Sequence, residues 1–174
     1  MVQLRQKKIS SMSSFSNRIV NWYKSNGRHD LPWRKNISPY SIWISEIMLQ
    51  QTQVKTVVPY FNKFIKKYPN LDALLKASED EILAQWSGLG FYRRAKNIYK
   101  ACRVISEDFN NKLPININDL ESLPGIGRST AGAIMSIAFN EGHPILDANV
   151  KRVLGRYKKI SFKTENEKQK KLWL

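Results

Sequence analysis

The chain has 174 residues, of which 42% are hydrophobic and 11% aromatic, enough for one domain or two small lobes with a buried core. No run of about 18 uncharged apolar residues and no apolar signal stretch occur, so we expect neither a membrane span nor a secretory signal. The formal net charge is +15, and residues 1–35 and 148–174 each carry a net +7. Such a basic chain favours a polyanionic partner, most often nucleic acid.

The spacing of apolar residues is helical nearly throughout, without a convincing strand alternation. The first expected helix carries an apolar face from Phe15 to Tyr23 and ends near Gly27. Ser38 followed by Pro39 predicts the start of a helix through YSIWISEIMLQQ, because serine is a favoured N-cap and proline fits the first helical position. We therefore predict an all-α fold.

Capping patterns predict further helices. Ser78 with Glu81 forms a capping box before EILAQW, and Asn118 with Glu121 forms a weaker one before the short DLESL. The other expected helices are VVPYFNKFIKKY, the long basic FYRRAKNIYKACRVISEDF, RSTAGAIMSIAF and, after a break at 141–144, NVKRVLGRY.

The turn LPGIG joins two of these helices, so residues 119–138 predict a helix–hairpin–helix. The first amides of the second helix lack intrahelical partners, and glycine lets a phosphate approach them closely. A basic side chain and hydroxyls follow directly. The pattern predicts a clamp for a DNA phosphate, and the alternative is an ordinary helix–helix turn. The clamp residues are Gly125, Ile126, Gly127, Arg128 and Ser129.

Two carboxylates stand in apolar surroundings. Glu46 lies in SIWISEIMLQQ and Asp147 in HPILDANV, neither beside a basic residue. A desolvated carboxyl has a raised pKa and can donate a proton near neutral pH, while a second carboxylate stabilises a developing cation. This pairing is the logic of glycosidic cleavage. Taken singly, each residue has a simpler interpretation, a solvated helix face for Glu46 and a helix cap for Asp147.

Five motifs in order carry a family resemblance. LPWR, WISEIMLQQTQV, GLGFYRRA, LPGIGRSTAGAI and ILDANVKRVL resemble adenine DNA glycosylases of the MutY type, in the helix–hairpin–helix glycosylase superfamily. The resemblance implies removal of adenine mispaired with 8-oxoguanine or guanine in duplex DNA, by an enzyme that flips the adenine out of the stack.

The resemblance also implies roles for individual residues. Glu46 matches the catalytic acid that protonates adenine at N7 and later activates water, and Asp147 matches the carboxylate that stabilises the sugar cation, supported by Asn149. Trp33, Arg34 and Leu49 match the surroundings of the base pocket, and Gln51 matches the side chain that enters the duplex. Phe91 and Tyr92 fall on the motif that is wedged beside the damaged base.

Three positions deserve comparison with the family pattern. Bifunctional relatives carry a nucleophilic lysine where this chain has Ser129, so we expect water to be the nucleophile and no strand scission. Phe91 replaces a usual tyrosine, which predicts weaker discrimination of 8-oxoguanine from guanine. Ala148 replaces a usual glycine and is expected to crowd the aspartate slightly.

The resemblance implies a six-helix barrel lobe over 30–140 and a second lobe built from 1–29 and 141–174. We expect the chain to be the N-terminal catalytic part only, because the family continues into a four-cysteine loop that binds a 4Fe–4S cluster and a C-terminal domain. The only cysteine here is Cys102, so no metal site is expected in this chain. We expect a cytoplasmic monomer that binds duplex DNA and no membrane. The alternatives are a non-catalytic DNA-binding remnant and a related glycosylase with another base preference.

Overall fold

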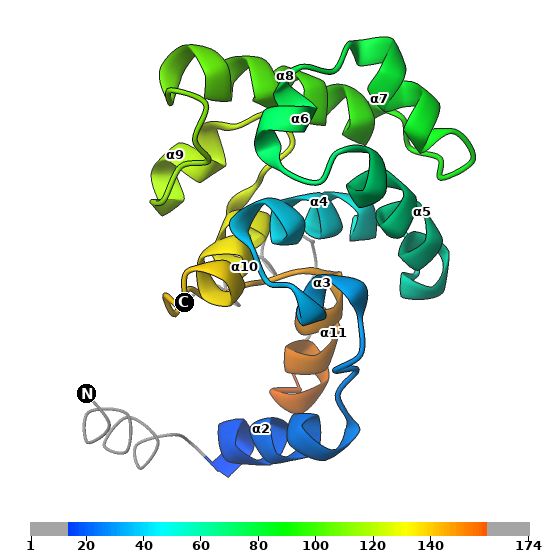
Figure 1. Ribbon diagram of the computed structural model, residues 1–174. Coiled ribbons are helices and arrows are strands. Elements are labelled where there is room, and N and C mark those ends of the chain that lie inside the picture. Colours follow the sequence, from blue (N-terminus) through cyan, green and yellow to red (C-terminus); the bar gives the residue numbers. More distant parts are fainter. Residues whose placement is uncertain (1–13, 160–174) are drawn as a thin grey trace.

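The computed structural model describes residues 14–159, and every regular element in that range is a helix (Figure 1). The all-α prediction is confirmed. None of these helices combines the length and apolarity needed to cross a membrane. The helices are α2 (Ser14–Asn26), α3 (Pro32–Lys35), α4 (Pro39–Leu49), α5 (Val54–Lys67), α6 (Leu71–Leu75), α7 (Glu79–Trp86), α8 (Arg93–Asp108), α9 (Ile117–Ser122), α10 (Arg128–Ala138) and α11 (Ala148–Tyr157).

The helix α4 forms the centre of the core and packs against α5 and α10 (Figure 1). The Ser38 hydroxyl accepts a hydrogen bond of 3.1 Å from the amide of Ser41, and Pro39 is the first helical residue, which confirms the predicted start. Eight of the eleven residues of α4 are buried. A helix that is apolar on nearly all sides belongs in an interior, so any polar side chain on α4 sits in an apolar environment.

Two helix starts test the predicted capping patterns. The Ser78 amide donates to Glu81 at 2.9 Å and the Glu81 amide donates to the Ser78 hydroxyl at 3.2 Å, so this capping box is confirmed. The prediction of a cap at Asn118 is wrong. Asn116 caps α9 and accepts from the amide of Asp119 at 2.9 Å, because the same favourable spacing of asparagine and acid occurs two residues earlier.

The helices α2 and α11 lie together at one end of the molecule, although they are far apart in sequence (Figure 1). The rings of Phe15 and Tyr157 stack with centroids 3.9 Å apart. The helix α2 ends at Asn26, and the Gly27 amide donates to the Tyr23 carbonyl at 2.8 Å, which confirms the predicted end. The boundaries of the two predicted lobes stay a prediction, and residues 1–13 and 160–174 lie outside the described range.

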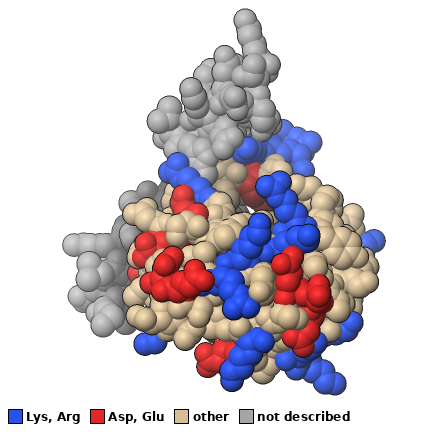
Figure 2. Space-filling view, turned by 90° about the horizontal axis from the view of Figure 1, so that it is seen from above, with Lys and Arg blue, Asp and Glu red and all other residues tan. Residues whose placement is uncertain are grey.

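The face seen from above in Figure 2 carries lysine and arginine intermingled with aspartate and glutamate. This face therefore lacks the single-sign basic character that a polyanion prefers.

Candidate active site

Glu46 is the only acidic residue of α4, and its neighbours Ser45 and Ile47 are fully buried. Burial withdraws water from its carboxyl and raises the pKa of Glu46 to about 7; the charge of Arg34 opposes this rise and that of Asp147 adds to it. The three side chains are therefore within electrostatic reach of one another. The Glu46 carboxyl retains its proton close to neutral pH, as a general acid must.

The short helix α3 places Arg34 near this carboxyl. Trp33 anchors α3 in the core, where its buried ring meets the ring of Phe61 edge-on with centroids 5.2 Å apart. The Arg34 guanidinium lies 5.7 Å from the centre of the Tyr23 ring, a cation–π distance. An aromatic residue of α2 thus contacts the arginine that modulates Glu46.

Asp147 is the N-cap of α11, which confirms its simpler interpretation. One oxygen accepts a hydrogen bond of 2.7 Å from the amide of Val150, and the other accepts a long bond of 3.5 Å from the Asn149 side chain. Asn149 in turn accepts from Arg152 at 2.8 Å. Asp147 and Ala148 are both exposed. Because Asp147 also influences the pKa of Glu46, capping and proximity to the acid coexist.

One side of α10 holds the extended segment 143–146 that leads to the aspartate. The Ser129 hydroxyl accepts from the Leu146 amide at 3.1 Å, and the Ser136 hydroxyl exchanges two bonds of 3.1 Å with the backbone at the start of the segment. Between them, a Cβ on Gly132 would approach a carbonyl oxygen of the segment to 2.8 Å. The bond made by Ser129 was absent from the sequence prediction, because periodicity does not indicate tertiary partners.

The two glycines of the LPGIG turn have different reasons to be glycine. Gly125 has a left-handed φ of 84°, and a Cβ there would meet Asn97 at 2.8 Å. Gly127 caps α10 and faces open space, which leaves the helix N-terminus accessible. Arg128 is exposed, whereas Ile126 is buried. The side chain of Ile126 is therefore unavailable for the predicted DNA contact, and only its backbone is suited to it.

Gln51 and Phe91 stand at two exposed loop tips, and both have the left-handed conformation that non-glycine residues rarely adopt, with φ of 57° and 49°. The Phe91 side chain is 57% exposed. Tyr92 follows it, is exposed, and accepts a bond of 3.4 Å from the Gly88 amide. Leu49, at the end of α4, is partly buried. The predicted probes of the duplex therefore project from strained turns.

Arg94 was missed by sequence reasoning. It is buried in the structure, at 6% exposure, and its side chain donates to main-chain carbonyls at the end of α4 and in the loop before α8. In a helix with a net basic composition, a single buried arginine has no distinguishing sequence signal, since arginines are mostly exposed.

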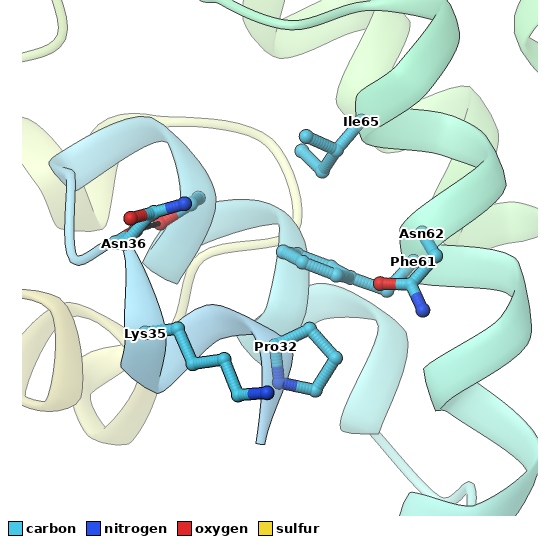
Figure 3. A pocket seen from close by; sticks show the side chains of 7 residues that line it. Pro32, Lys35, Asn36, Phe61, Asn62 and Ile65 are labelled. Carbon is cyan, nitrogen blue, oxygen red and sulfur yellow. Dashed lines mark hydrogen bonds between the residues drawn. The ribbon is translucent and has the colours of Figure 1, made fainter. Parts of the chain in front are cut away.

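A cavity of about 360 Å³ opens between α3 and α5 (Figure 3). Phe61 and Ile65 extend from α5 towards Pro32 and Asn36 on the opposite wall, and neither Glu46 nor Asp147 lines it. The cavity is therefore separate from the carboxylate pair. Within residues 14–159, no group of three or more histidine, cysteine, aspartate or glutamate residues is arranged to hold a metal ion.

Cys102 bears on the iron–sulfur cluster that the resemblance implies. It is buried in α8, and burial raises the pKa of its thiol to about 12. Four thiolates hold a cluster of this type, and the chain has one cysteine. The residues present do not fit such a cluster.

Comparison with known proteins identifies a family that the chain matches. Residues 44–174 match the HhH-GPD superfamily, described as base excision DNA repair proteins. The chain is 54% identical over 160 residues to an adenine DNA glycosylase of Buchnera aphidicola subsp. Schizaphis graminum, covering 91% of this chain and 46% of that protein. It is 38% identical over 161 residues to the human adenine DNA glycosylase, covering 87% of this chain and 29% of the relative. The chain thus spans less than half the length of either protein.

Solved structures have the same fold. The structure of a thermostable thymine-DNA glycosylase superposes with a TM-score of 0.76 at 28% identity, covering 97% of this chain and 78% of that one. A trapped endonuclease III–DNA covalent intermediate gives a TM-score of 0.73 at 22% identity, covering 88% and 73%. The predicted helix–hairpin–helix glycosylase fold is confirmed.

Proposed function

Since this chain belongs to the HhH-GPD superfamily of base excision DNA repair proteins, we propose that it hydrolyses the N-glycosidic bond of adenine in duplex DNA. Adenine is in keeping with the names of its curated relatives, which are adenine DNA glycosylases. The substrate we propose is adenine paired with 8-oxoguanine or with guanine. The observation that carries the proposal is a carboxyl with a pKa of about 7, that of Glu46, within electrostatic reach of Asp147.

The proposed reaction uses these two groups in sequence. Glu46 donates its proton to N7 of the flipped adenine, and the electron pair of the C1′–N9 bond leaves with the base. The Asp147 carboxylate stabilises the positive charge on the sugar. Water then adds to C1′, and its proton passes to the Glu46 carboxylate, which restores the acid. The products are free adenine and an abasic site.

Asn149 and Arg34 support the two carboxyls. Asn149 donates to the Asp147 oxygen that does not accept from the α11 backbone, so both oxygens are oriented. Arg34 lowers the pKa of Glu46, against the effect of burial. We propose that these opposing effects keep the pKa of Glu46 close to neutral. The carboxyl can then donate its proton to the base in the first step and accept one from water in the second.

The proposed DNA contacts use exposed positions. Gln51 and Phe91 project from their loop tips towards the partner, and the open N-terminus of α10 at Gly127 receives a backbone phosphate beside Arg128. Phe91 supplies a stacking face without a hydroxyl. We therefore expect weaker discrimination of 8-oxoguanine from guanine than a tyrosine would give.

We propose that base removal is monofunctional. Forming an imine with the sugar requires an amine, and position 129 carries a hydroxyl whose oxygen accepts from the Leu146 amide. Borohydride trapping is the test: the protein is expected to give no covalent adduct with substrate DNA. A trapped adduct would contradict the proposal.

A second candidate activity is removal of thymine, favoured by the similarity to the thymine-DNA glycosylase structure at 28% identity. A single-turnover assay separates the candidates, with duplexes containing adenine opposite 8-oxoguanine, adenine opposite guanine, and thymine opposite guanine, followed by alkali. Adenine release that is lost in Glu46→Gln, with DNA binding retained, supports the proposal. Binding without any base release would identify a DNA-binding remnant and refute the activity.

A further inference from the structure

The buried guanidinium of Arg94 binds five main-chain carbonyls and no carboxylate. Its Nη1 donates to the carbonyls of Met48 at 2.6 Å, Gln50 at 2.7 Å and Ile47 at 3.3 Å. Within the described range no acidic side chain pairs with it. A cation without a counter-ion is stable in an interior only if its donors are satisfied, so these carbonyls are what holds the charge there.

The guanidinium divides its donors between the C-terminal end of α4 and the loop before α8. While Nη1 serves the end of α4, Nη2 donates to the Gly90 carbonyl at 3.0 Å and Nε to that of Phe91 at 3.5 Å. The last carbonyls of a helix have no intrahelical partners, so Arg94 satisfies α4 and at the same time fixes the loop before α8. The rings of Trp86 and Phe91 flank it at 5.4 and 5.2 Å.

Two of the carbonyls bound by Arg94 belong to the residues directly before the two strained tips. Gln50 precedes Gln51, and Gly90 precedes Phe91, and both tips have positive φ. A left-handed non-glycine residue is maintained only when its surroundings determine the backbone. One side chain therefore bonds to the backbone beside both tips, through different nitrogens of the same planar group.

The same network reaches the LPGIG turn. The Gln50 side chain donates to the Gly125 carbonyl at 3.2 Å, and Asn97, one turn after Arg94 on α8, packs where a Cβ of Gly125 would lie. The third DNA-facing segment is thus connected to the other two through residues adjacent to the Arg94 bonds.

We propose that Arg94 is a positioning residue that locks the Gln51 and Phe91 tips into one preformed pair, so that they meet a mispair together. The inference rests on the proposed function, because the two tips are the segments proposed to contact DNA. Arg94 touches neither the base nor the sugar. It holds the two loops in their binding conformation before DNA arrives, and this lowers the conformational entropy lost on binding.

Hydrogen exchange on the DNA-free chain tests whether the Arg94 hydrogen bonds hold the two loops together, a link called the Arg94 tie below. In Arg94→Lys, a single ammonium replaces a guanidinium whose nitrogens face different loops, so it cannot reproduce both sets of bonds in their original geometry. We expect amide exchange to rise at least about tenfold around Gln51, around Phe91 or at both. The matched control is Arg93→Lys, which makes the same change at the exposed neighbour and should leave both segments as in the wild type. Unchanged exchange in Arg94→Lys would overturn the proposal.

Binding measurements test the use of the tie. Titration of wild type and Arg94→Lys with an adenine:8-oxoguanine duplex and a fully paired duplex should show the preference for the mispair falling about tenfold. The single-turnover rate at saturating DNA should fall less than the preference does, because Arg94 bonds to main-chain carbonyls and not to the carboxyls of Glu46 or Asp147. Faster amide exchange in the loops of Arg94→Lys, together with an unchanged preference for the mispaired duplex, would overturn the positioning role. If the wild type shows no preference or base release, the proposed function fails, and the exchange result still decides whether the tie exists.

Discussion

Replacing Glu46 with glutamine should stabilise the protein above neutral pH while abolishing base removal. The pKa of Glu46 rises from an ordinary 4.5 to about 7 on folding, so the folded state binds this proton more tightly than the unfolded state. Each tenfold difference in proton affinity corresponds to about 1.4 kcal/mol. The ionised carboxylate therefore costs the folded state about 3 kcal/mol, a penalty that is absent in Glu46→Gln.

The sign of the pH dependence follows from the raised pKa. Below pH 4.5 the carboxyl is neutral in both states, and variant and wild type should have the same free energy of unfolding. Between pH 4.5 and about 7 the wild type loses stability relative to the variant, and above pH 7 the difference reaches its full value. The rate of base removal by the wild type should also fall as the pH rises through about 7, because an ionised Glu46 has no proton to donate.

Urea unfolding followed by circular dichroism, repeated across this pH range, measures the difference directly. Glu107→Gln is the matched control, because it removes the same charge from an exposed position on α8, and it should not reproduce the pH-dependent gain. A Glu46→Gln variant that is equally stable or less stable than the wild type above pH 7 would refute the reasoning. The Glu46 carboxyl would then be solvated, and its role as a proton donor would lose its physical basis.

Three further substitutions test how the site is arranged. Arg34→Met removes a charge that lowers the pKa of Glu46, so the alkaline limb of the single-turnover pH profile should move to higher pH; a move to lower pH contradicts the arrangement. Ser129→Ala leaves the Leu146 amide without its acceptor and should reduce stability by about 1 kcal/mol, measured by urea unfolding with Ser129→Thr as the hydroxyl-bearing control. Gly132→Ala places a methyl 2.8 Å from a carbonyl of segment 143–146, and should lower the rate of base release more than it lowers DNA affinity; an unchanged rate would show that the segment yields without moving the aspartate.

The sequence could predict the elements whose signals are local. Ser38 with Pro39 marked the start of α4, and Ser78 with Glu81 marked that of α7, since caps depend on residues three positions apart. The predicted proximity of Glu46 and Asp147 rested on the absence of basic neighbours and on the resemblance, and the influence of one on the pKa of the other agrees with it.

Tertiary partners were beyond such reasoning. Gly125 looked like a means of approaching phosphate, but its neighbour Asn97 belongs to another helix. Arg94 looked like one more charge on a basic helix, and its burial depends on carbonyls more than forty residues away. Asn118 shows a different limit, because two overlapping capping patterns competed and the earlier one at Asn116 prevailed. Local rules rank such candidates poorly when both satisfy them.

The backbone that carries Glu46 and the backbone that carries Asp147 differ in local stability. Glu46 stands on a helix enclosed by the core, whereas Asp147 is exposed at the end of a segment held to α10 by two serine hydroxyls. Local openings need less free energy than unfolding of the whole domain. On warming, the aspartate should therefore separate from the acid while α4 is still intact. If the proposed activity is present, its loss on heating should therefore be reversible at first and should begin below the unfolding temperature of the domain.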